Sequence, residues 1–190
     1  MQEIVATDKY KKKIITIPNI LSFIRLCLIP IIVWLYVGKQ DHIMAGVFVI
    51  ISGITDIVDG FIARTFNMIS DVGKVLDPIA DKATQTVVVI LLVTRFPLML
   101  IPLIIGLIKE AFMGISGYMI VKKCKIVLGA HWYGKLATFV LTATMILHLF
   151  WYNINNYVSV ATIIASGLTL TLALVLYAVR NFSYLLGKIK

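Results

Sequence analysis

Four of the five aspartates in residues 56–81 lie at spacings that place them in two pairs. Asp56 and Asp59 are three residues apart, and Asp77 and Asp81 are four residues apart. In an α-helix, side chains at these spacings lie on one face, so each pair would point in one direction. Carboxylate oxygens are the ligands that Mg²⁺, Mn²⁺ or Ca²⁺ prefer, and they argue against zinc. The pattern therefore predicts two divalent cations, about 4 Å apart, that clamp the attacking and leaving oxygens of a phosphoryl group.

The two pairs also lie symmetrically about one turn, which predicts that they face each other. The midpoint between Asp56 and Asp81 and that between Asp59 and Asp77 both fall near Asn67–Met68. If two helices form an antiparallel hairpin around this turn, Asp56 lies level with Asp81, and Asp59 lies level with Asp77. The deeper pair is then roughly 12 Å from the turn, because a helix rises about 1.5 Å per residue. Four carboxylates so placed repel one another and need divalent cations at neutral pH.

Two glycines, Gly60 and Gly73, accompany the acids on this hairpin. Neither has a side chain, so a ligand or the opposite backbone can approach closely at these positions. Glycine also occurs in membrane helices simply because it lets helices pack closely. The residues themselves leave both interpretations open.

The composition predicts an all-α integral membrane protein. Of the 190 residues, 60% are hydrophobic and only 14% are charged, whereas soluble domains are about half apolar and a quarter charged. A membrane-spanning helix needs about 20 mostly apolar residues. Six segments meet this need: 20–37, 43–63, 75–95, 96–120, 133–152 and 157–178. Residues 1–190 are expected to form a single membrane domain, with the active site in the hairpin of the second and third helices.

The amino-terminal part combines a basic segment, residues 1–16, with the start of the first apolar run. Arg25 and Pro30 interrupt that run. We therefore expect residues 17–25 to form a short interfacial helix that leads into a shorter first span.

The net charge of +9 predicts orientation in a membrane and attraction to anionic lipid headgroups. With the amino terminus inside, twelve Lys and Arg residues lie at the inner ends, and only Lys39 and Arg95 lie in outer loops. Both termini and the 64–74 turn, with the acidic site, are thus expected at the cytosolic face. The polar segments are too short for a nucleic-acid-binding domain, so no nucleic acid is expected as a partner.

Acids in such a stretch could also belong to a solvated loop or to a transporter. A solvated loop would carry aspartates, but Asp56 and Asp81 each lie inside a long apolar run. A cation or proton transporter would keep acids in the membrane, and it would place them through the membrane depth. Here, apart from Glu110, the acids of the apolar segments cluster on one hairpin. Each aspartate at the bilayer centre costs about 2.5–3.5 kcal/mol, which favours a catalytic metal site that compensates this cost.

Residues 56–81 read D-x2-D-G-x2-A-R-x8-G-x3-D-x3-D. This pattern resembles the signature of the CDP-alcohol phosphotransferase family, whose members make glycerophospholipids. Residues 18–25 are similar to the family's amino-terminal P-N-x-L-[ST]-x-x-R element. The resemblance covers most of the chain, including the number of helices, and it implies that a phosphatidyl group moves from CDP-diacylglycerol to an alcohol, with release of CMP.

The resemblance also implies roles for single residues. Asp56, Asp59, Asp77 and Asp81 would hold two Mg²⁺ or Mn²⁺ ions, and Asp81 would also act as the general base that takes the proton of the acceptor hydroxyl. The CDP part of the donor would be bound by Asn19, Asp59, Gly60, Ala63, Arg64 and Gly73. Arg64 suits this role because the arginine side chain pairs with phosphate in a bidentate fork. Family members also suggest a homodimer, in this case in a bacterial plasma membrane.

The acceptor alcohol is expected to bind to the fourth and fifth helices and the basic loop between them. The residues assigned to it are Lys109, Lys135, Thr138 and Arg25. The step from Lys109 to Glu110 could instead be a structural ion pair. Equally, the basic run Lys122, Lys123 and Lys125 could serve only as a positive anchor at the inner face.

Relatives that use glycerol 3-phosphate carry A-R-E, then a second Arg eight residues on, and later G-K-x-K-T. This chain departs from that pattern with Lys109, Gly117 and Ala137. Two or three Arg or Lys side chains best hold a dianionic phosphate, and Lys109 and Lys135 remain. Glycerol 3-phosphate is therefore the first acceptor expected from the sequence. Phosphatidylglycerol, which would give cardiolipin, is the second, because cardiolipin synthases of the family begin the fifth helix in a similar way.

Overall fold

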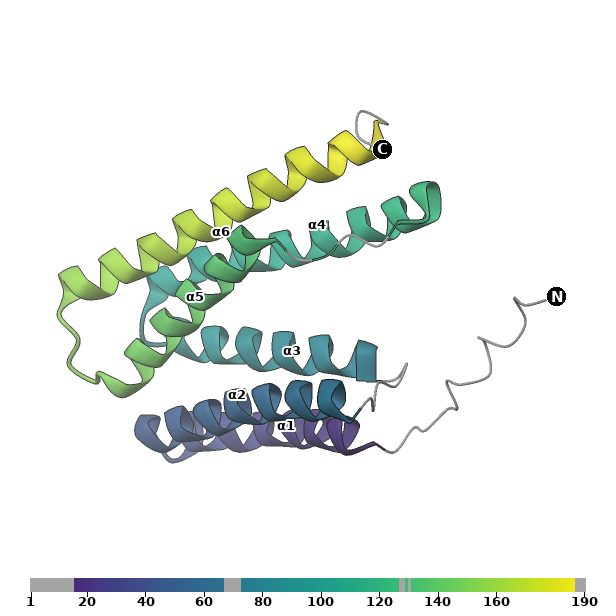
Figure 1. Cartoon of the computed structure of the whole chain (residues 1–190). Coiled ribbons are helices and arrows are strands. Elements are labelled where there is room, and N and C mark those ends of the chain that lie inside the picture. The colour runs from purple at the N-terminus through teal and green to yellow at the C-terminus, as the bar shows by residue number, and fades with distance from the viewer. Residues whose placement is uncertain (1–15, 67–72, 127–128, 130, 187–190) are drawn as a thin grey trace. The chain divides into compact units, whose positions relative to one another are not determined.

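The computed structural model describes residues 16–66, 73–126, 129 and 131–186, apart from the side chains at 63, 64, 74, 75 and 124. Within these ranges the chain is helical and contains no strand (Figure 1), which confirms the all-α prediction. The α-helices are α1 (Ile17–Val33), α2 (His42–Thr65), α3 (Gly73–Val93), α4 (Leu100–Cys124), α5 (Trp132–Phe150) and α6 (Asn156–Leu185). A π-helical turn, η1 (Trp34–Gly38), follows α1, and a 3₁₀ turn, η2 (Pro97–Met99), precedes α4.

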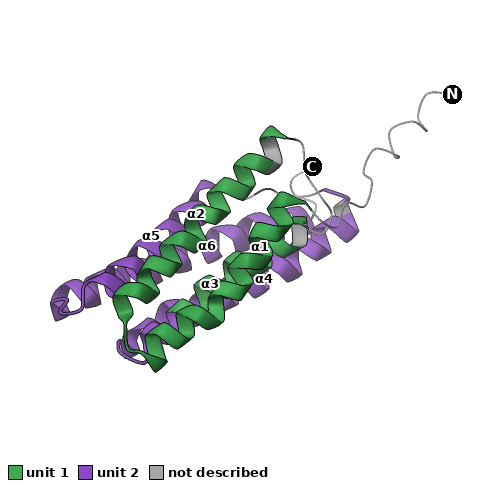
Figure 2. Cartoon of the chain, turned by 90° about the horizontal axis from the view of Figure 1, so that it is seen from below, with its two compact units in different colours: residues 1–88 green, residues 89–190 purple. Residues whose placement is uncertain are grey.

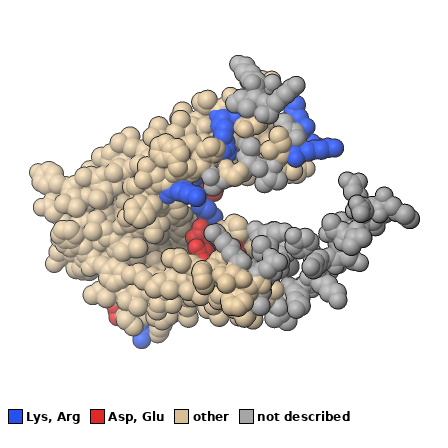
Figure 3. Space-filling model, viewed as in Figure 1, with Lys and Arg blue, Asp and Glu red and all other residues tan. Residues whose placement is uncertain are grey.

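Five stretches of the described helices are long and apolar enough to cross a membrane: Ile17–Gly38, His42–Ile62, Pro97–Lys123, Trp132–Phe150 and Asn156–Leu185. Figure 3 shows large areas of surface that carry no charged side chain, as expected for helices that meet lipid. These are the helices of a multi-pass membrane protein. The predicted third span, α3, is 21 residues long but carries Asp77, Asp81 and Lys82 within its length. It is therefore less apolar than the other five, and the count of six spans stays a prediction.

Local signals in the sequence explain where the first two helices begin. The Thr16 side chain accepts a hydrogen bond from Asn19 N at 3.4 Å, and Pro18 occupies the first turn, where a missing N–H costs nothing. Asp41 caps α2 by accepting a hydrogen bond from Met44 N at 2.9 Å. Both caps satisfy backbone donors that have no partner within the helix.

Residues 17–25 are part of one longer helix, and their expected place at the membrane interface stays a prediction. The structure has one helix, α1, from Ile17 to Val33, and Pro30 lies within it without ending it. The expectation came mainly from Arg25, whose charge would favour water. In the fold, Arg25 is only 1% exposed because carboxylates of α2 compensate its charge. An arginine paired in this way can lie inside a continuous apolar helix.

The chain divides into two compact units, 1–88 and 89–190, with the boundary inside α3 (Figure 2). In the first unit, α1 packs along α2, and η1 contacts both helices. Its buried apolar side chains include Ile32, Leu35, Tyr36, Ala45 and Val49.

In the second unit, α6 packs against both α4 and α5. Its buried apolar side chains include Ile120, Leu141, Met145, Leu149, Ile163 and Leu170. Because lipid is as apolar as these side chains, close packing and interhelical hydrogen bonds hold such helices together.

Buried polar groups of the second unit pair with one another. His148 Nδ1 lies 2.8 Å from the carbonyl oxygen of Thr144, and its Nε2 lies 2.9 Å from Ser159 Oγ. A carbonyl can only accept, so Nδ1 donates to it, and Nε2 accepts from the serine hydroxyl. Asn181 Nδ2 donates to Ser116 Oγ at 2.7 Å and thereby links α6 to α4. These neutral pairs fasten α6 to its two neighbours.

Candidate functional site

The predicted acids of α2 and α3 meet a buried arginine of α1. Arg25 Nη1 forms an ion pair with Asp56 Oδ1, and its Nη2 donates to Asp59 Oδ2 at 2.6 Å. The same Nη2 lies 3.6 Å from Asp77 Oδ1. One guanidinium thus gathers three of the four predicted metal ligands, here called the acid cluster (Asp56, Asp59 and Asp77).

A second side chain of α1 reaches the same cluster. Ser22 is three residues before Arg25, so the two share a face of α1, and both are buried. Ser22 Oγ forms a hydrogen bond with Asp77 Oδ1 and lies 2.9 Å from the carbonyl oxygen of Pro18. One face of α1 therefore positions Asp77 of α3 relative to the acids of α2.

The acid cluster carries more negative charge than Arg25 can balance. Three carboxylates face one guanidinium, so two formal negative charges remain within this group. Asp59 has a side-chain exposure of only 2%, whereas the Asp56 and Asp77 side chains are 45% and 36% exposed. The cluster thus has a buried end and an open end. Its donor atoms are all oxygens, which is the set that a hard divalent cation prefers.

The described residues contain no group of three or more His, Cys, Asp and Glu side chains arranged to hold a metal ion. The guanidinium of Arg25 is the cationic group that contacts all three carboxylates of the acid cluster. The predicted level pairing of Asp56 with Asp81 and of Asp59 with Asp77 stays a prediction.

The other residues assigned to metal and CDP lie near the acid cluster in sequence. Asp81 is four residues after Asp77 on α3 and is exposed, whereas Asn19 is 6% exposed, three residues before Ser22. Gly60 directly follows Asp59, and no described atom lies within 4 Å of the point where a Cβ would stand. Among the described residues, no atom fills the space beside Gly60.

The other three residues assigned to CDP flank the segment between α2 and α3. Gly73 is buried at the start of α3. The side chains of Ala63 and Arg64 lie outside the described residues, so their predicted contacts with CDP stay predictions.

Sequence reasoning placed Arg25 with the acceptor and gave Ser22 no role. Their contacts with the acid cluster join residues between 31 and 55 positions apart, which helical spacing does not reveal. The available signal was that Ser22 and Arg25 lie three residues apart in a mostly apolar helix. Two polar side chains on one face of such a helix indicate a polar partner on a neighbouring helix.

The residues assigned to the acceptor in the second unit show one clear pairing. Lys109 Nζ lies 2.8 Å from Glu110 Oε1, with side-chain exposures of 6% and 39%. Lys135 is exposed at the start of α5. The Thr138 hydroxyl donates to the carbonyl oxygen of Gly134 at 3.1 Å and is thus engaged within its own helix. The structural alternative considered for Lys109 and Glu110 is therefore realised as an ion pair.

The basic run at the end of α4 is exposed. Lys122, Lys123 and Lys125 all face outward, and Lys123 Nζ donates to the carbonyl oxygen of Leu185 at 2.7 Å. Lys125 ends the helix with a φ of 56°, the left-handed conformation common after a helix.

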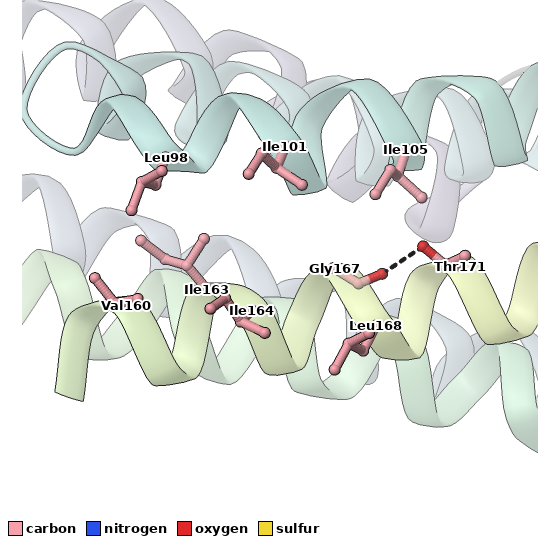
Figure 4. Close-up of a pocket in the computed structure, with 9 residues that line it drawn as sticks. All are labelled: Leu98, Ile101, Ile105, Val160, Ile163, Ile164, Gly167, Leu168 and Thr171. Atoms are coloured by element: carbon pink, nitrogen blue, oxygen red, sulfur yellow. Dashed lines mark hydrogen bonds between the residues drawn. The ribbon is translucent and has the colours of Figure 1, made fainter. Parts of the chain in front are cut away.

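A pocket of about 340 Å³ lies between the start of α4 and the first half of α6 (Figure 4). Its lining is hydrocarbon from residues such as Ile101, Ile105 and Ile164. The Thr171 hydroxyl in this lining donates to the carbonyl oxygen of Gly167 at 2.8 Å. The pocket therefore offers no group for catalysis, and the acid cluster is the candidate active site.

Comparison with known proteins identifies the family to which the chain belongs. The model of the CDP-alcohol phosphatidyltransferase family matches residues 15–181, which include the acid cluster and Asp81. The chain is 46% identical over 98 residues to a cardiolipin synthase (CMP-forming)/mitochondrial hydrolase fusion protein of Schizosaccharomyces pombe. It is 39% identical over 85 residues to a cardiolipin synthase (CMP-forming) of Streptomyces coelicolor. It is 36% identical over 96 residues to a CDP-diacylglycerol–glycerol-3-phosphate 3-phosphatidyltransferase of Rickettsia bellii.

These three alignments cover 50%, 42% and 50% of the chain, respectively. They cover 16%, 40% and 53% of the relatives, so the matched region spans about half of their length or less.

Proposed function

The chain belongs to the CDP-alcohol phosphatidyltransferase family, and we propose that it transfers a phosphatidyl group from CDP-diacylglycerol to an alcohol, with release of CMP. The observation that carries this proposal is the acid cluster, in which Asp56, Asp59 and Asp77 converge on one buried guanidinium. These acids lie within the stretch that resembles the family's signature. Their convergence indicates a functional role for that stretch, because carboxylates whose charge is not balanced do not stabilise helix packing.

The excess negative charge of the acid cluster fits divalent cations as cofactors. Asp56, Asp59 and Asp77, together with Asp81, would hold two Mg²⁺ or Mn²⁺ ions. When bound, such ions draw charge from the diphosphate and make CMP a better leaving group.

Asp81 acts as the general base in this proposal. Its carboxylate takes the proton of the acceptor hydroxyl as the oxygen attacks the phosphorus that bears diacylglycerol. A new P–O bond forms to the acceptor, and the bond from that phosphorus to the bridging oxygen of CMP breaks. The exposure of Asp81 supports this role, because the acceptor must reach it. The space beside Gly60, which no described atom fills, supports a donor site next to Asp59.

We propose phosphatidylglycerol as the acceptor to test first, ahead of glycerol 3-phosphate, which the sequence alone ranked first. Lys109 stands where glycerol-phosphate users carry Arg, and Glu110 offsets its charge at 2.8 Å. A phosphate monoester carries about 1.5 to 2 negative charges, whereas the phosphodiester of phosphatidylglycerol carries one. A site with fewer uncompensated cations suits the phosphodiester better. Two of the relatives described above are named cardiolipin synthases, which also supports this acceptor.

Glycerol 3-phosphate is the second candidate acceptor. Lys135 at the start of α5 favours it, because this exposed lysine is accessible to a phosphate. The relative from Rickettsia bellii, whose name includes glycerol-3-phosphate, also supports it.

The placement of the site in the membrane is part of the proposal. The excess of Lys and Arg at the ends expected inside supports two cytosolic termini and an acid cluster near the cytosolic face. The acyl chains of CDP-diacylglycerol would then stay in lipid while its headgroup enters from the cytosol. We also retain six spans, with α3 as the third, and a homodimer as proposals.

CMP release by the purified protein tests the function. The assay supplies CDP-diacylglycerol, Mg²⁺ or Mn²⁺, and either phosphatidylglycerol or glycerol 3-phosphate. We expect CMP to form with phosphatidylglycerol, at a rate at least tenfold above that with glycerol 3-phosphate, which corresponds to about 1.4 kcal/mol. Faster release with glycerol 3-phosphate would reverse the acceptor assignment. No release with either acceptor would contradict the proposed function.

A further inference from the structure

We propose that Arg25 is an internal counterion of the acid cluster, which takes the place of a divalent cation until one binds and thereby lowers the affinity of the site for metal. This inference rests on the proposed function only in taking the acid cluster as a metal site. It differs from the role expected from the sequence, in which Arg25 contacts the acceptor.

The first support is the geometry of the guanidinium. Both of its terminal nitrogens are committed to carboxylates of α2, because Nη1 pairs with Asp56 and Nη2 donates to Asp59 at 2.6 Å. Asp77 Oδ1 of α3 lies 3.6 Å from the same Nη2. Arg25 thus contacts acids from both helices of the hairpin, as a bound cation would.

The second support is burial. Arg25 is 1% exposed, and its Nε has no hydrogen-bond partner among the described residues. A buried donor without a partner costs free energy, so Nε does not hold the side chain in this position. The attraction between the terminal nitrogens and the carboxylates holds it there, since a buried charge needs an opposite charge nearby.

The third support is competition for the same atoms. Asp56 Oδ1, Asp59 Oδ2 and Asp77 Oδ1 are the oxygens that face Arg25. A divalent cation bound by this cluster must share or replace the contacts of the guanidinium with these oxygens. While Arg25 holds these oxygens, the molecule is not competent to bind metal. The apparent affinity for metal is therefore the intrinsic affinity multiplied by the fraction of molecules in which the oxygens are available. Without metal, the same contacts stabilise the fold.

Mn²⁺ binding to the full-length protein in detergent, followed by electron paramagnetic resonance, tests the inference. We expect Arg25→Gln to lower the Kd for Mn²⁺ at least about tenfold, a change equal to about 1.4 kcal/mol. The matched control is Lys39→Gln, which removes one positive charge from the same unit. Lys39 is exposed and lies beyond the carboxyl-terminal end of α1, with its Nζ 4.4 Å from the centroid of the Trp34 ring. We expect no change in Kd for this control.

Thermal unfolding provides a second reading of the same variants. We expect Arg25→Gln to unfold at a lower temperature than the wild type without metal, and saturating Mn²⁺ to remove most of this difference. An unchanged or weaker Mn²⁺ affinity in folded Arg25→Gln would overturn the inference. It would favour a role for Arg25 in holding the ligands in place or in binding substrate.

Arg25→Lys keeps the inference testable if Arg25→Gln does not fold. A lysine has one compact ammonium group in place of a planar fork, so it cannot bridge two carboxylates in the same way. We expect its Kd for Mn²⁺ to fall below that of the wild type, and a Kd equal to or above the wild-type value would overturn the inference. Neither readout uses CMP release, so an enzyme inactive with both acceptors could still show the expected Mn²⁺ affinities. That outcome would contradict the proposed function and leave this inference intact.

Discussion

Buried polar groups occur in both compact units, but they are balanced in different ways. In the second unit, His148 pairs with Ser159, and Asn181 pairs with Ser116, through neutral hydrogen bonds between helices. In the first unit, Arg25 faces three carboxylates and leaves the group with excess negative charge. The neutral pairs are complete, so they explain helix packing without any further molecule. The acid cluster is not balanced by its own residues, and this difference marks it as the site that binds something.

The largest expected effect comes from Asp81→Asn in the first unit. A general base contributes about 10²- to 10⁴-fold to the rate, so we expect CMP release to fall by that factor while the protein stays folded. The matched control is Asp41→Asn, which changes an exposed acid of the same unit. Asp41 caps α2 through Met44 N, and asparagine caps about as well as aspartate. Activity near the wild-type level in Asp81→Asn would remove the assigned base from the mechanism.

Gly134→Ala in the second unit should affect stability more than chemistry. An added Cβ would collide with the Tyr177 ring, whose nearest carbons lie 2.9 Å from its position. Overpacking of this kind costs about 1–3 kcal/mol, to be measured as a lower unfolding temperature in detergent. Gly106→Ala is the control, because no described atom lies within 4 Å of its added Cβ. Equal unfolding temperatures for the two variants would show that the contact between α5 and α6 is looser than described.

Ser159→Ala is expected to lower stability by about as much as Gly134→Ala and to leave catalysis unchanged. It leaves His148 Nε2 without its hydrogen-bond donor at a buried position, which costs about 1–3 kcal/mol of stability. The rate of CMP release per folded molecule should not change. Ser183→Ala is the control, since its hydroxyl donates only to the carbonyl oxygen of Val179 in the same helix. A large loss of turnover in folded Ser159→Ala would mean that the neutral pairs also serve catalysis, and the contrast between the units would fail.

Spacing along the chain predicted what depends on a single helix. The shared faces of Asp56 with Asp59 and of Asp77 with Asp81 follow from helical geometry. The apolar runs located the helices to within a few residues at most ends. The end of α6 is an exception, because its apolar run was expected to stop at 178 and the helix continues to Leu185.

Contacts between distant segments could not be predicted in the same way. Arg25 and Asp59 are 34 residues apart, and nothing in either local pattern indicates that they meet. The same limit hid the continuity of α1 past Arg25, because an unpaired arginine favours water whereas a paired one can lie inside an apolar helix. The acceptor site was also beyond spacing arguments, since whether Lys109 is available to a phosphate depends on its pairing with Glu110.

Anomalous X-ray scattering from crystals grown with Mn²⁺ tests the central claim most directly, namely that the acid cluster is a site for divalent cations. We predict anomalous peaks within coordination distance of carboxylate oxygens of Asp56, Asp59 and Asp77, with the Arg25 guanidinium displaced from its contacts with them. Saturating Mn²⁺ with no peak at these carboxylates, and with Arg25 still paired to Asp56 and Asp59, would contradict it.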